Sequence, residues 1–255
     1  MSRSISDDAK KAARKSVRGS RLAARATKEA LTYLVERSIR PSRDAKVRAK
    51  QKLGRGVLAS AGFEVTVHGE LPDERDGYLL VANHRSAFDI AVLLGHVPDA
   101  VLLSRGDLAD WPALGWLAKE GDTLFVDRAD RANGAKAIRA MRRALTDGRH
   151  LCVFPEGTTH DEETVRPFQA GAFAAARGLR SHVVPVGIAY AHGLEWIQKS
   201  MGEHIGEVLG RERLAIDVEI GAPLVTEGLR SDAAAELARD AVQALFARAT
   251  ARVRR

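Results

Sequence analysis

Short β-favouring runs alternate with helical patterns from residue 63 to the end of this chain, and no other feature limits its possible folds as much. Strands that alternate with helices are typical of an α/β protein, and we expect a mixed sheet of about seven strands flanked by helices. The expected strands are Phe63–Val67, Tyr78–Ala82, Ala100–Ser104, Thr123–Val126, His150–Phe154, His182–Ala189 and Leu214–Ile220. The expected helices lie around 87–96, 110–119, 133–147 and 169–179, with a closing helix from Ser231, its expected N-cap.

The first 56 residues differ from the rest of the chain in charge. They hold 17 Lys and Arg against 5 Asp and Glu, a net charge of +12, whereas residues 57–255 hold 23 against 28, a net charge of −5. Helical patterns run from Asp7 to Arg40 and from Arg43 to Ala61, and Pro41 separates them because proline breaks helices. We therefore expect a basic helical hairpin over residues 1–56, followed by an α/β domain over residues 57–255.

Two partners of different class suit such a basic segment: an anionic membrane surface and a nucleic acid. Only 5% of the residues are aromatic and no aromatic-rich RNA-binding motif occurs, which favours the membrane and predicts no nucleic-acid partner. No apolar stretch reaches the 18 residues of a membrane span, and the N-terminus lacks the apolar core of a secretory signal. With Cys152 as the single cysteine, a reducing compartment is the simplest assumption. We expect a cytoplasmic protein, peripheral on the inner face of the cell membrane.

His84 and Asp89 follow the apolar run that ends at Ala82, and they can form a general base with its orienting carboxylate. Five residues along a regular helix place two side chains about 140° apart, so both cannot lie in one helix and still meet. His84 is therefore expected on the turn after the strand, with Asp89 reaching back from the first helical turn and Ser86 as the N-cap. The alternative is a helix-capping Asp89 beside an ordinary loop histidine.

A second polar cluster, Phe154–Thr159, follows the strand His150–Phe154. Glu156 offers a carboxylate, and Gly157 lets backbone amides approach a ligand closely. Arg128 follows another expected strand and can clamp an anionic group. The alternatives are an ordinary polar turn and a surface ion pair. Cys152 lies in mid-strand, where a cysteine is typically a small buried hydrophobe, so we do not expect it to act as a nucleophile.

Together these turns resemble the phospholipid/glycerol acyltransferase family, which includes 1-acylglycerol-3-phosphate acyltransferase. Four motifs occur in the family's order within about residues 57–225. They are Asn83, His84 and Asp89 of Asn-His-x4-Asp, Phe125 and Arg128 of Phe-x-x-Arg, Phe154–Thr158 of Phe-Pro-Glu-Gly-Thr, and Val184–Val186 of Val-Pro-Val.

The resemblance implies a direct acyl transfer. His84 would deprotonate the acceptor hydroxyl, which attacks the thioester of acyl-CoA or acyl-carrier protein, and Asp89 would hold the imidazole. The resemblance implies no metal and no cofactor besides this acyl donor. The implied substrate-binding residues are Arg105, Arg128, Glu156, Gly157, Thr158 and Thr159.

The acceptor that the resemblance favours is a lysophospholipid, 1-acylglycerol-3-phosphate, giving phosphatidic acid. The family often has lysine where Arg105 stands, and an arginine there binds phosphate bidentately. It also often has arginine where Thr159 stands. Glu-Gly-Thr-Thr followed by the acidic stretch His160–Glu163 resembles members that acylate lyso-ornithine lipid, which is the alternative acceptor.

Overall fold

The computed structural model of the chain has one seven-stranded sheet in the order β1-β7-β6-β2-β5-β3-β4, which confirms the expected α/β class. It describes residues 2–39, 42–72, 77–106, 118, 122–126, 131–179, 182–191 and 193–254. The strands are β1 (Glu64–His68), β2 (Leu79–Ala82), β3 (Ala100–Arg105), β4 (Leu124–Val126), β5 (His150–Val153), β6 (Val183–Tyr190) and β7 (Ala215–Ile220).

The sheet is mixed because one pair of strands, β6 and β7, runs antiparallel while the other paired strands are parallel. The five strands from β6 to β4 therefore end at the same edge. Strands β2 and β6 are buried along their whole length, as expected of central strands covered on both faces. The turns that follow β2 and β5 consequently lie at one edge of a buried core.

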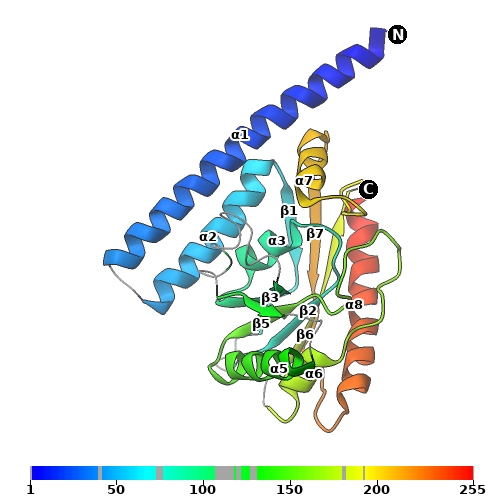
Figure 1. Cartoon of the computed structure of the whole chain (residues 1–255). Helices are drawn as coiled ribbons and strands as arrows, with labels where there is room; N and C mark the ends of the chain where they lie inside the picture. The colour runs from blue at the N-terminus through cyan, green and yellow to red at the C-terminus, as the bar shows by residue number, and fades with distance from the viewer. Residues whose placement is uncertain are drawn as a thin grey trace.

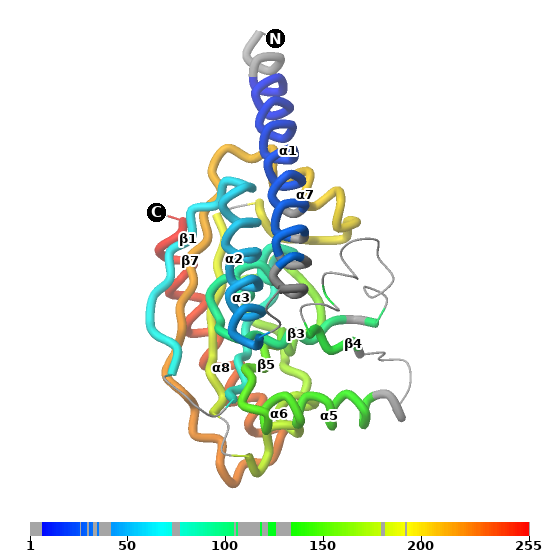
Figure 2. Tube along the Cα trace, turned by 90° about the vertical axis from the view of Figure 1, so that its left-hand side faces the viewer, coloured from blue at the N-terminus to red at the C-terminus, as the bar shows by residue number. Residues whose placement is uncertain are grey.

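Helices cover both faces of the sheet (Figure 1). On one face lie α2 (Arg43–Ala61) and α3 (Asp89–His96), and on the other lie α5 (Arg131–Thr146), α6 (Gly171–Ala176) and α8 (Ser231–Val253). The long helix α1 (Ser2–Ile39) packs on α2 and on α7 (Met201–Gly210), outside the first layer (Figure 2). Among the described residues, no helix is both long enough and apolar enough to span a lipid bilayer.

The basic hairpin is tied closely to the α/β unit. A Cβ atom on Gly54 of α2 would lie 2.4 Å from the backbone nitrogen of Gly95 in α3, so this helix crossing requires glycine. On the other side, Arg14 of α1 donates to the Gly210 carbonyl (3.2 Å), and Arg18 donates to the Arg211 carbonyl (2.5 Å). These arginines satisfy carbonyls at the end of α7, which lack partners within their own helix. The expected division after residue 56 falls inside α2.

Some local expectations were wrong. Helix α3 begins at Asp89 with Phe88 at the N-cap, so Ser86 is not the cap. Helix α8 begins at Ser231 itself, and Arg230 occupies the N-cap position without a capping side-chain bond. Helix α7 was not expected, although Ser200 and Glu203 form a capping box at its start. The helix expected around 110–119 lies outside the described residues, except for residue 118.

At the other end of the sheet, two carboxylates gather cations from several elements. Asp99 accepts hydrogen bonds from Arg43 (2.7 Å) and Arg149 (3.0 Å), and Asp122 forms ion pairs with Lys46 (2.6 Å) and Arg149 (2.8 Å). Burial by itself raises the pKa of both carboxyls, but these hydrogen bonds and charges outweigh it and hold the pKa values below their ordinary range. The cluster ties the start of α2 to the sheet.

The substitution Asp99→Asn tests this cluster. Asn tolerates the positive φ of 40° at this position, so the change removes charge with little backbone strain. Arg43, Lys50 and Arg149 lose a partner, and we expect the free energy of unfolding at pH 7 to fall by about 3 kcal/mol. Denaturant unfolding measures the loss, with the exposed Glu70→Gln as control.

The same cluster predicts a pH dependence. A carboxyl whose pKa is lowered in the folded state contributes stability above its unfolded pKa of about 3.9, and this contribution disappears as the pH falls through the folded-state pKa. The difference in unfolding free energy between Asp99→Asn and the wild type should therefore shrink below about pH 4. An equal difference at pH 7 and pH 3 would contradict the assignment.

Candidate active site

The turn after β2 brings His84 and Asp89 together. Nδ1 of His84 lies 2.7 Å from Oδ2 of Asp89, and the imidazole stacks on the Phe154 ring with centroids 4.1 Å apart. The Asp89 side chain is 0% exposed, whereas the His84 side chain is 17% exposed. Asp89 is thus buried behind His84, and the His84 imidazole reaches the surface of the site.

Asp89 is held by four hydrogen bonds. Its Oδ2 also accepts the backbone N–H groups of Arg85 (2.7 Å) and Ser86 (2.9 Å), and its Oδ1 accepts the Tyr190 hydroxyl (2.6 Å). Tyr190 is the last residue of β6. A buried carboxylate is costly unless such donors satisfy it, and here the turn and a neighbouring strand supply them. Asp89 reaches back to the turn, as the sequence predicts.

This arrangement fixes the imidazole tautomer. A carboxylate at Nδ1 favours the form that carries its hydrogen on Nδ1, which leaves the lone pair on Nε2. No hydrogen bond to Nε2 of His84 occurs among the described residues. His84 therefore presents a basic nitrogen at the strand-end edge of the sheet.

Asn83 anchors the start of this turn. Its side-chain amide donates to the Ile188 carbonyl (2.9 Å), and its side-chain oxygen accepts the Ile188 N–H (2.8 Å). Asn83 is 0% exposed, and its two bonds join the end of β2 to β6. The motif asparagine thus places His84 relative to the strand that carries Tyr190.

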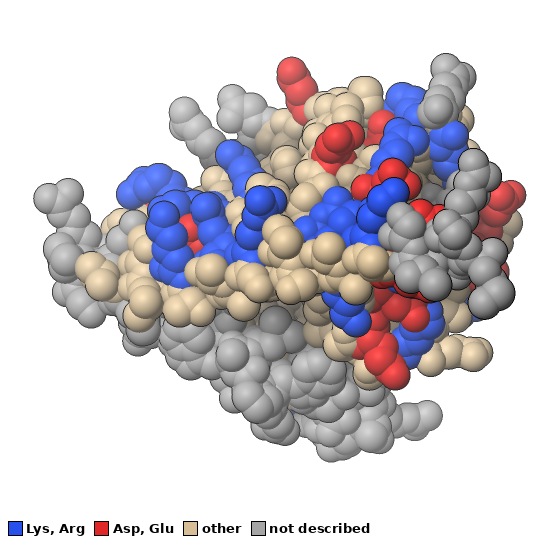
Figure 3. Space-filling model, turned by 90° about the horizontal axis from the view of Figure 1, so that it is seen from above, with Lys and Arg blue, Asp and Glu red and all other residues tan. Residues whose placement is uncertain are grey.

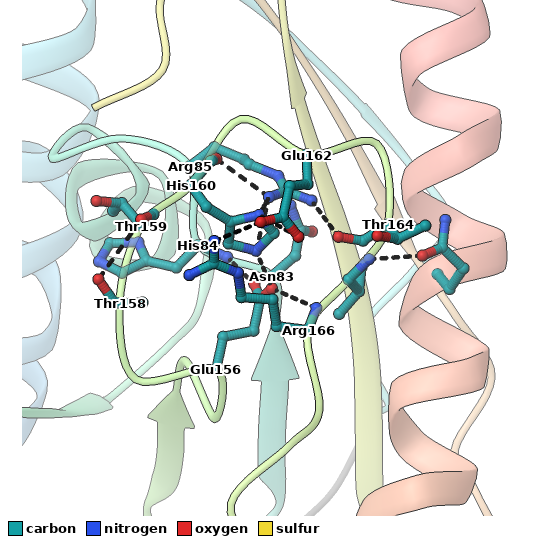
Figure 4. A network of polar contacts seen from close by, with 12 residues as sticks. Asn83, His84, Arg85, Glu156, Thr158, Thr159, His160, Glu162, Thr164 and Arg166 are labelled. Atoms are coloured by element: carbon teal, nitrogen blue, oxygen red, sulfur yellow. Dashed lines mark hydrogen bonds and ion pairs between the residues drawn. The ribbon is translucent and has the colours of Figure 1, made fainter. Parts of the chain in front are cut away.

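The second cluster follows β5 at the same edge. Gly157 closes the turn with its N–H bonded to the Phe154 carbonyl (3.1 Å), and its φ of 79° is a conformation that favours glycine. Oε1 of Glu156 accepts the backbone N–H of His84 (2.7 Å), so the two motifs are in direct contact. Thr158 is exposed and Thr159 is partly buried on the loop beyond (Figure 4).

Sequence reasoning missed two buried partners of this cluster, Arg85 and His160. Both are almost fully buried, at 2% and 3% exposure. Nη1 of Arg85 lies 2.6 Å from Nδ1 of His160, and Nε2 of His160 is hydrogen-bonded to Glu156 (Figure 4). The acidic residues around His160 predict an exposed loop. Only His160 departs from that expectation, because it turns inward while residues 161–163 are exposed.

A third missed residue, His204 of α7, lies behind the turn. Its Nε2 is 2.9 Å from the Ser86 hydroxyl oxygen, and the Trp196 ring stacks on it with centroids 5.5 Å apart. Burial lowers the pKa of His204 to about 4, so this histidine is neutral near pH 7. It supports Ser86 as a fixed polar partner.

Two expected site residues are not placed. Arg128 lies outside the described residues, and of Arg105 only the backbone, at the end of β3, is described. Cys152 is 0% exposed within β5, and burial raises the pKa of its thiol to about 12, which fits the expected structural role. Among the described residues, no cluster of three or more His, Cys, Asp or Glu side chains is arranged to hold a metal ion.

Comparison with known proteins is consistent with this arrangement. The acyltransferase family profile matches residues 64–189. The lyso-ornithine lipid O-acyltransferase of Pseudomonas aeruginosa is 36% identical over 196 residues, which cover 74% of this chain and 73% of that protein. The 1-acyl-sn-glycerol-3-phosphate acyltransferase of Neisseria meningitidis is 30% identical over 147 residues, 58% of this chain and 57% of that protein.

A solved structure has the same fold. The crystal structure of the 1-acyl-sn-glycerophosphate acyltransferase from Thermotoga maritima matches with a TM-score of 0.70 at 21% identity, over 92% of this chain and 97% of that one. The turns that carry His84 and Glu156 lie within the matched family region and meet at one edge of the sheet. The chain belongs to the acyltransferase family.

Proposed function

We propose that this protein transfers a fatty acyl group from a thioester, acyl-CoA or acyl-carrier protein, to the free hydroxyl of a lysolipid. The observation that carries the proposal is the His84 imidazole, bonded through Nδ1 to the buried Asp89, with Nε2 open at the site. A base held in this way typically contributes about 10²–10⁴ in rate.

In the proposed reaction, Nε2 of His84 takes the proton of the acceptor hydroxyl. The oxygen attacks the thioester carbonyl and forms a tetrahedral intermediate, and the carbon–sulfur bond then breaks. The departing sulfur receives the proton from the imidazolium, so the products are an ester and a free thiol. The negative charge of Asp89 stabilises the imidazolium while both steps proceed.

For the acceptor, we propose lyso-ornithine lipid ahead of 1-acylglycerol-3-phosphate. The lyso-ornithine lipid acyltransferase of Pseudomonas aeruginosa is the more similar of the two relatives compared above, in identity and in coverage. Thr159 also offers a hydroxyl rather than the arginine charge that suits a phosphate. We propose that Thr158, Thr159, Arg105 and Arg128 bind the acceptor.

Replacing the base tests the reaction. His84→Ala should lower kcat for thioester-dependent acylation by at least about 10²-fold, because no group remains to accept the hydroxyl proton. Thiol release from acyl-CoA in the presence of a lysolipid measures it. His68→Ala on the edge strand β1 is the matched control, and a native far-UV spectrum shows that each variant folds. A folded His84→Ala with wild-type activity would overturn the assignment.

A panel of acceptors tests the choice of lipid. Lyso-ornithine lipid should give a kcat/KM at least about tenfold above that of 1-acylglycerol-3-phosphate, which corresponds to about 1.4 kcal/mol of transition-state preference. The same thiol-release assay applies, with each lysolipid at equal chain length. A preference for 1-acylglycerol-3-phosphate would reverse the order of the two acceptors and leave the reaction type unchanged.

We also propose that α1 docks on an anionic membrane surface, which would place the enzyme as a peripheral protein on the inner face of the cell membrane. Lys and Arg side chains gather in a band across the face seen from above (Figure 3). At 100° per residue, six exposed charged or large apolar residues of α1 fall within a sector of about 80°. They are Lys10, Val17, Arg21, Lys28, Leu31 and Val35.

This sector combines the two features of an interfacial helix, apolar side chains and basic side chains. Val17, Leu31 and Val35 are 50%, 59% and 56% exposed, and they are three of the six exposed large hydrophobic residues in the described part of the chain. Arg14 and Arg18 point elsewhere, since they bond to the end of α7. The exposed side chains of this sector, which we call the α1 stripe, are therefore free to contact lipid.

Neutralising the basic residues of the α1 stripe tests whether this helix docks on the membrane. The triple substitution of Lys10, Arg21 and Lys28 by Gln should weaken binding to vesicles containing phosphatidylglycerol by on the order of 100-fold, from about 1 kcal/mol per charge. Co-sedimentation measures the partition coefficient.

The matched control removes three exposed charges from another helix, by replacing Lys136, Arg139 and Arg143 of α5 with Gln. It should bind nearly as the wild type does. Equal weakening by both triple variants would mean that binding follows net charge alone and not the α1 stripe.

A further inference from the structure

Both oxygens of the Glu156 carboxylate are hydrogen-bonded to the protein itself. Oε1 accepts the backbone N–H of His84 (2.7 Å), and Oε2 accepts the backbone N–H of Arg166 (2.8 Å) and is bonded to Nε2 of His160. The Glu156 side chain is 0% exposed. A carboxylate that binds an acceptor needs an oxygen turned toward the ligand, whereas this one is directed at the backbone of His84.

The hydrogen bonds that reach Glu156 have a defined direction. A guanidinium can only donate, so Nη1 of Arg85 donates to an imidazole nitrogen of His160. Nη1 lies 2.6 Å from Nδ1 and 2.8 Å from Nε2 of His160, and Glu156 already engages Nε2. The tautomer that suits both neighbours has Nε2–H donating to Glu156 and the lone pair of Nδ1 left for Arg85. The imidazole of His160 is neutral and links a buried cation to a buried anion.

Arg85 is itself held rigidly. Nη1 also donates to the His160 carbonyl (3.1 Å), and the Phe246 ring of α8 lies 4.5 Å from the guanidinium carbon. The backbone N–H of Arg85 bonds to Asp89 (2.7 Å). One residue therefore supports both carboxylates that touch His84: Asp89 through its backbone, and Glu156 through His160. A buried carboxylate without such compensation is strongly unfavourable.

We propose that His160, held by Arg85, is a positioning residue that keeps Glu156 against the backbone of His84. Glu156 fixes the backbone of His84 while Asp89 fixes its ring, and together they set where Nε2 meets the acceptor hydroxyl. Displacement of a reacting group by about 1 Å can cost on the order of 10²-fold in rate. This inference rests on the proposed role of His84 as the base.

A matched pair of variants separates positioning from acceptor binding. In His160→Gln the amide reaches the place of Nε2 and still donates to Glu156. In His160→Asn the side chain is one methylene shorter, so the amide reaches only the place of Nδ1. We expect His160→Asn to lower kcat at least about tenfold with both KM values within about threefold of wild type, and His160→Gln to keep kcat within about threefold.

A double-mutant cycle shows whether His160 acts through Glu156. In Glu156→Gln, an amide donor replaces an oxygen that faces the N–H of Arg166 and Nε2–H of His160, so kcat should fall. Adding His160→Asn to Glu156→Gln should lower kcat by no more than about threefold further, because residues acting as one unit are not additive. Circular dichroism and thermal unfolding establish that each variant is native. If His160→Asn does not fold, Arg85→Lys takes its place in the cycle, with the same expectations.

Three results would overturn the inference: equal kcat for the Asn and Gln variants, a raised acceptor KM with unchanged kcat, or multiplicative losses in the double variant. Failure of this inference is distinct from failure of the proposed function. An inactive His84→Ala together with a fully active His160→Asn removes only the positioning role. An active His84→Ala removes the base itself.

Discussion

The burial of one carboxylate, that of Asp89, is the constraint on which the rest of the site depends. An ionised group at 0% exposure persists only when hydrogen bonds replace the lost water. The turn gives it two backbone N–H groups, β6 gives the Tyr190 hydroxyl, and the fourth bond goes to His84. The hydrogen bond to His84 is the fourth that Asp89 accepts, and it also orients the imidazole. The stability of the buried carboxylate and the proposed catalytic role of His84 therefore require the same geometry.

That geometry follows from the topology of the sheet. β2, β5 and β6 are neighbours and parallel, so their ends meet at one edge and the turns that follow them come into contact. Asn83 fixes β2 to β6 at Ile188, and Glu156 brings the turn after β5 to the backbone of His84. Residues 72 positions apart in sequence are thus hydrogen-bonded.

The sequence predicted the fold and the central pair well for physical reasons. Apolar runs identify strands, and the five-residue spacing of His84 and Asp89 is compatible only with a turn followed by a helix. Helix starts were less predictable: Ser86 and Ser231 have good capping side chains, but the caps are Phe88 and Arg230. His160 was unpredictable because nothing local marks a histidine beside acidic residues as buried. In the fold it contacts Arg85, 75 positions away.

The two carboxylates around His84 illustrate how a protein divides one task between two groups. In the proposed reaction, Asp89 acts on the ring and stays charged, so that it stabilises a positive imidazole. Glu156 acts on the backbone, and its charge is balanced through a neutral imidazole by Arg85. If both carboxylates bonded to the ring, their repulsion would add to the cost of burial. Separating ring support from backbone support avoids that repulsion, and it accounts for a buried arginine at the position next to His84.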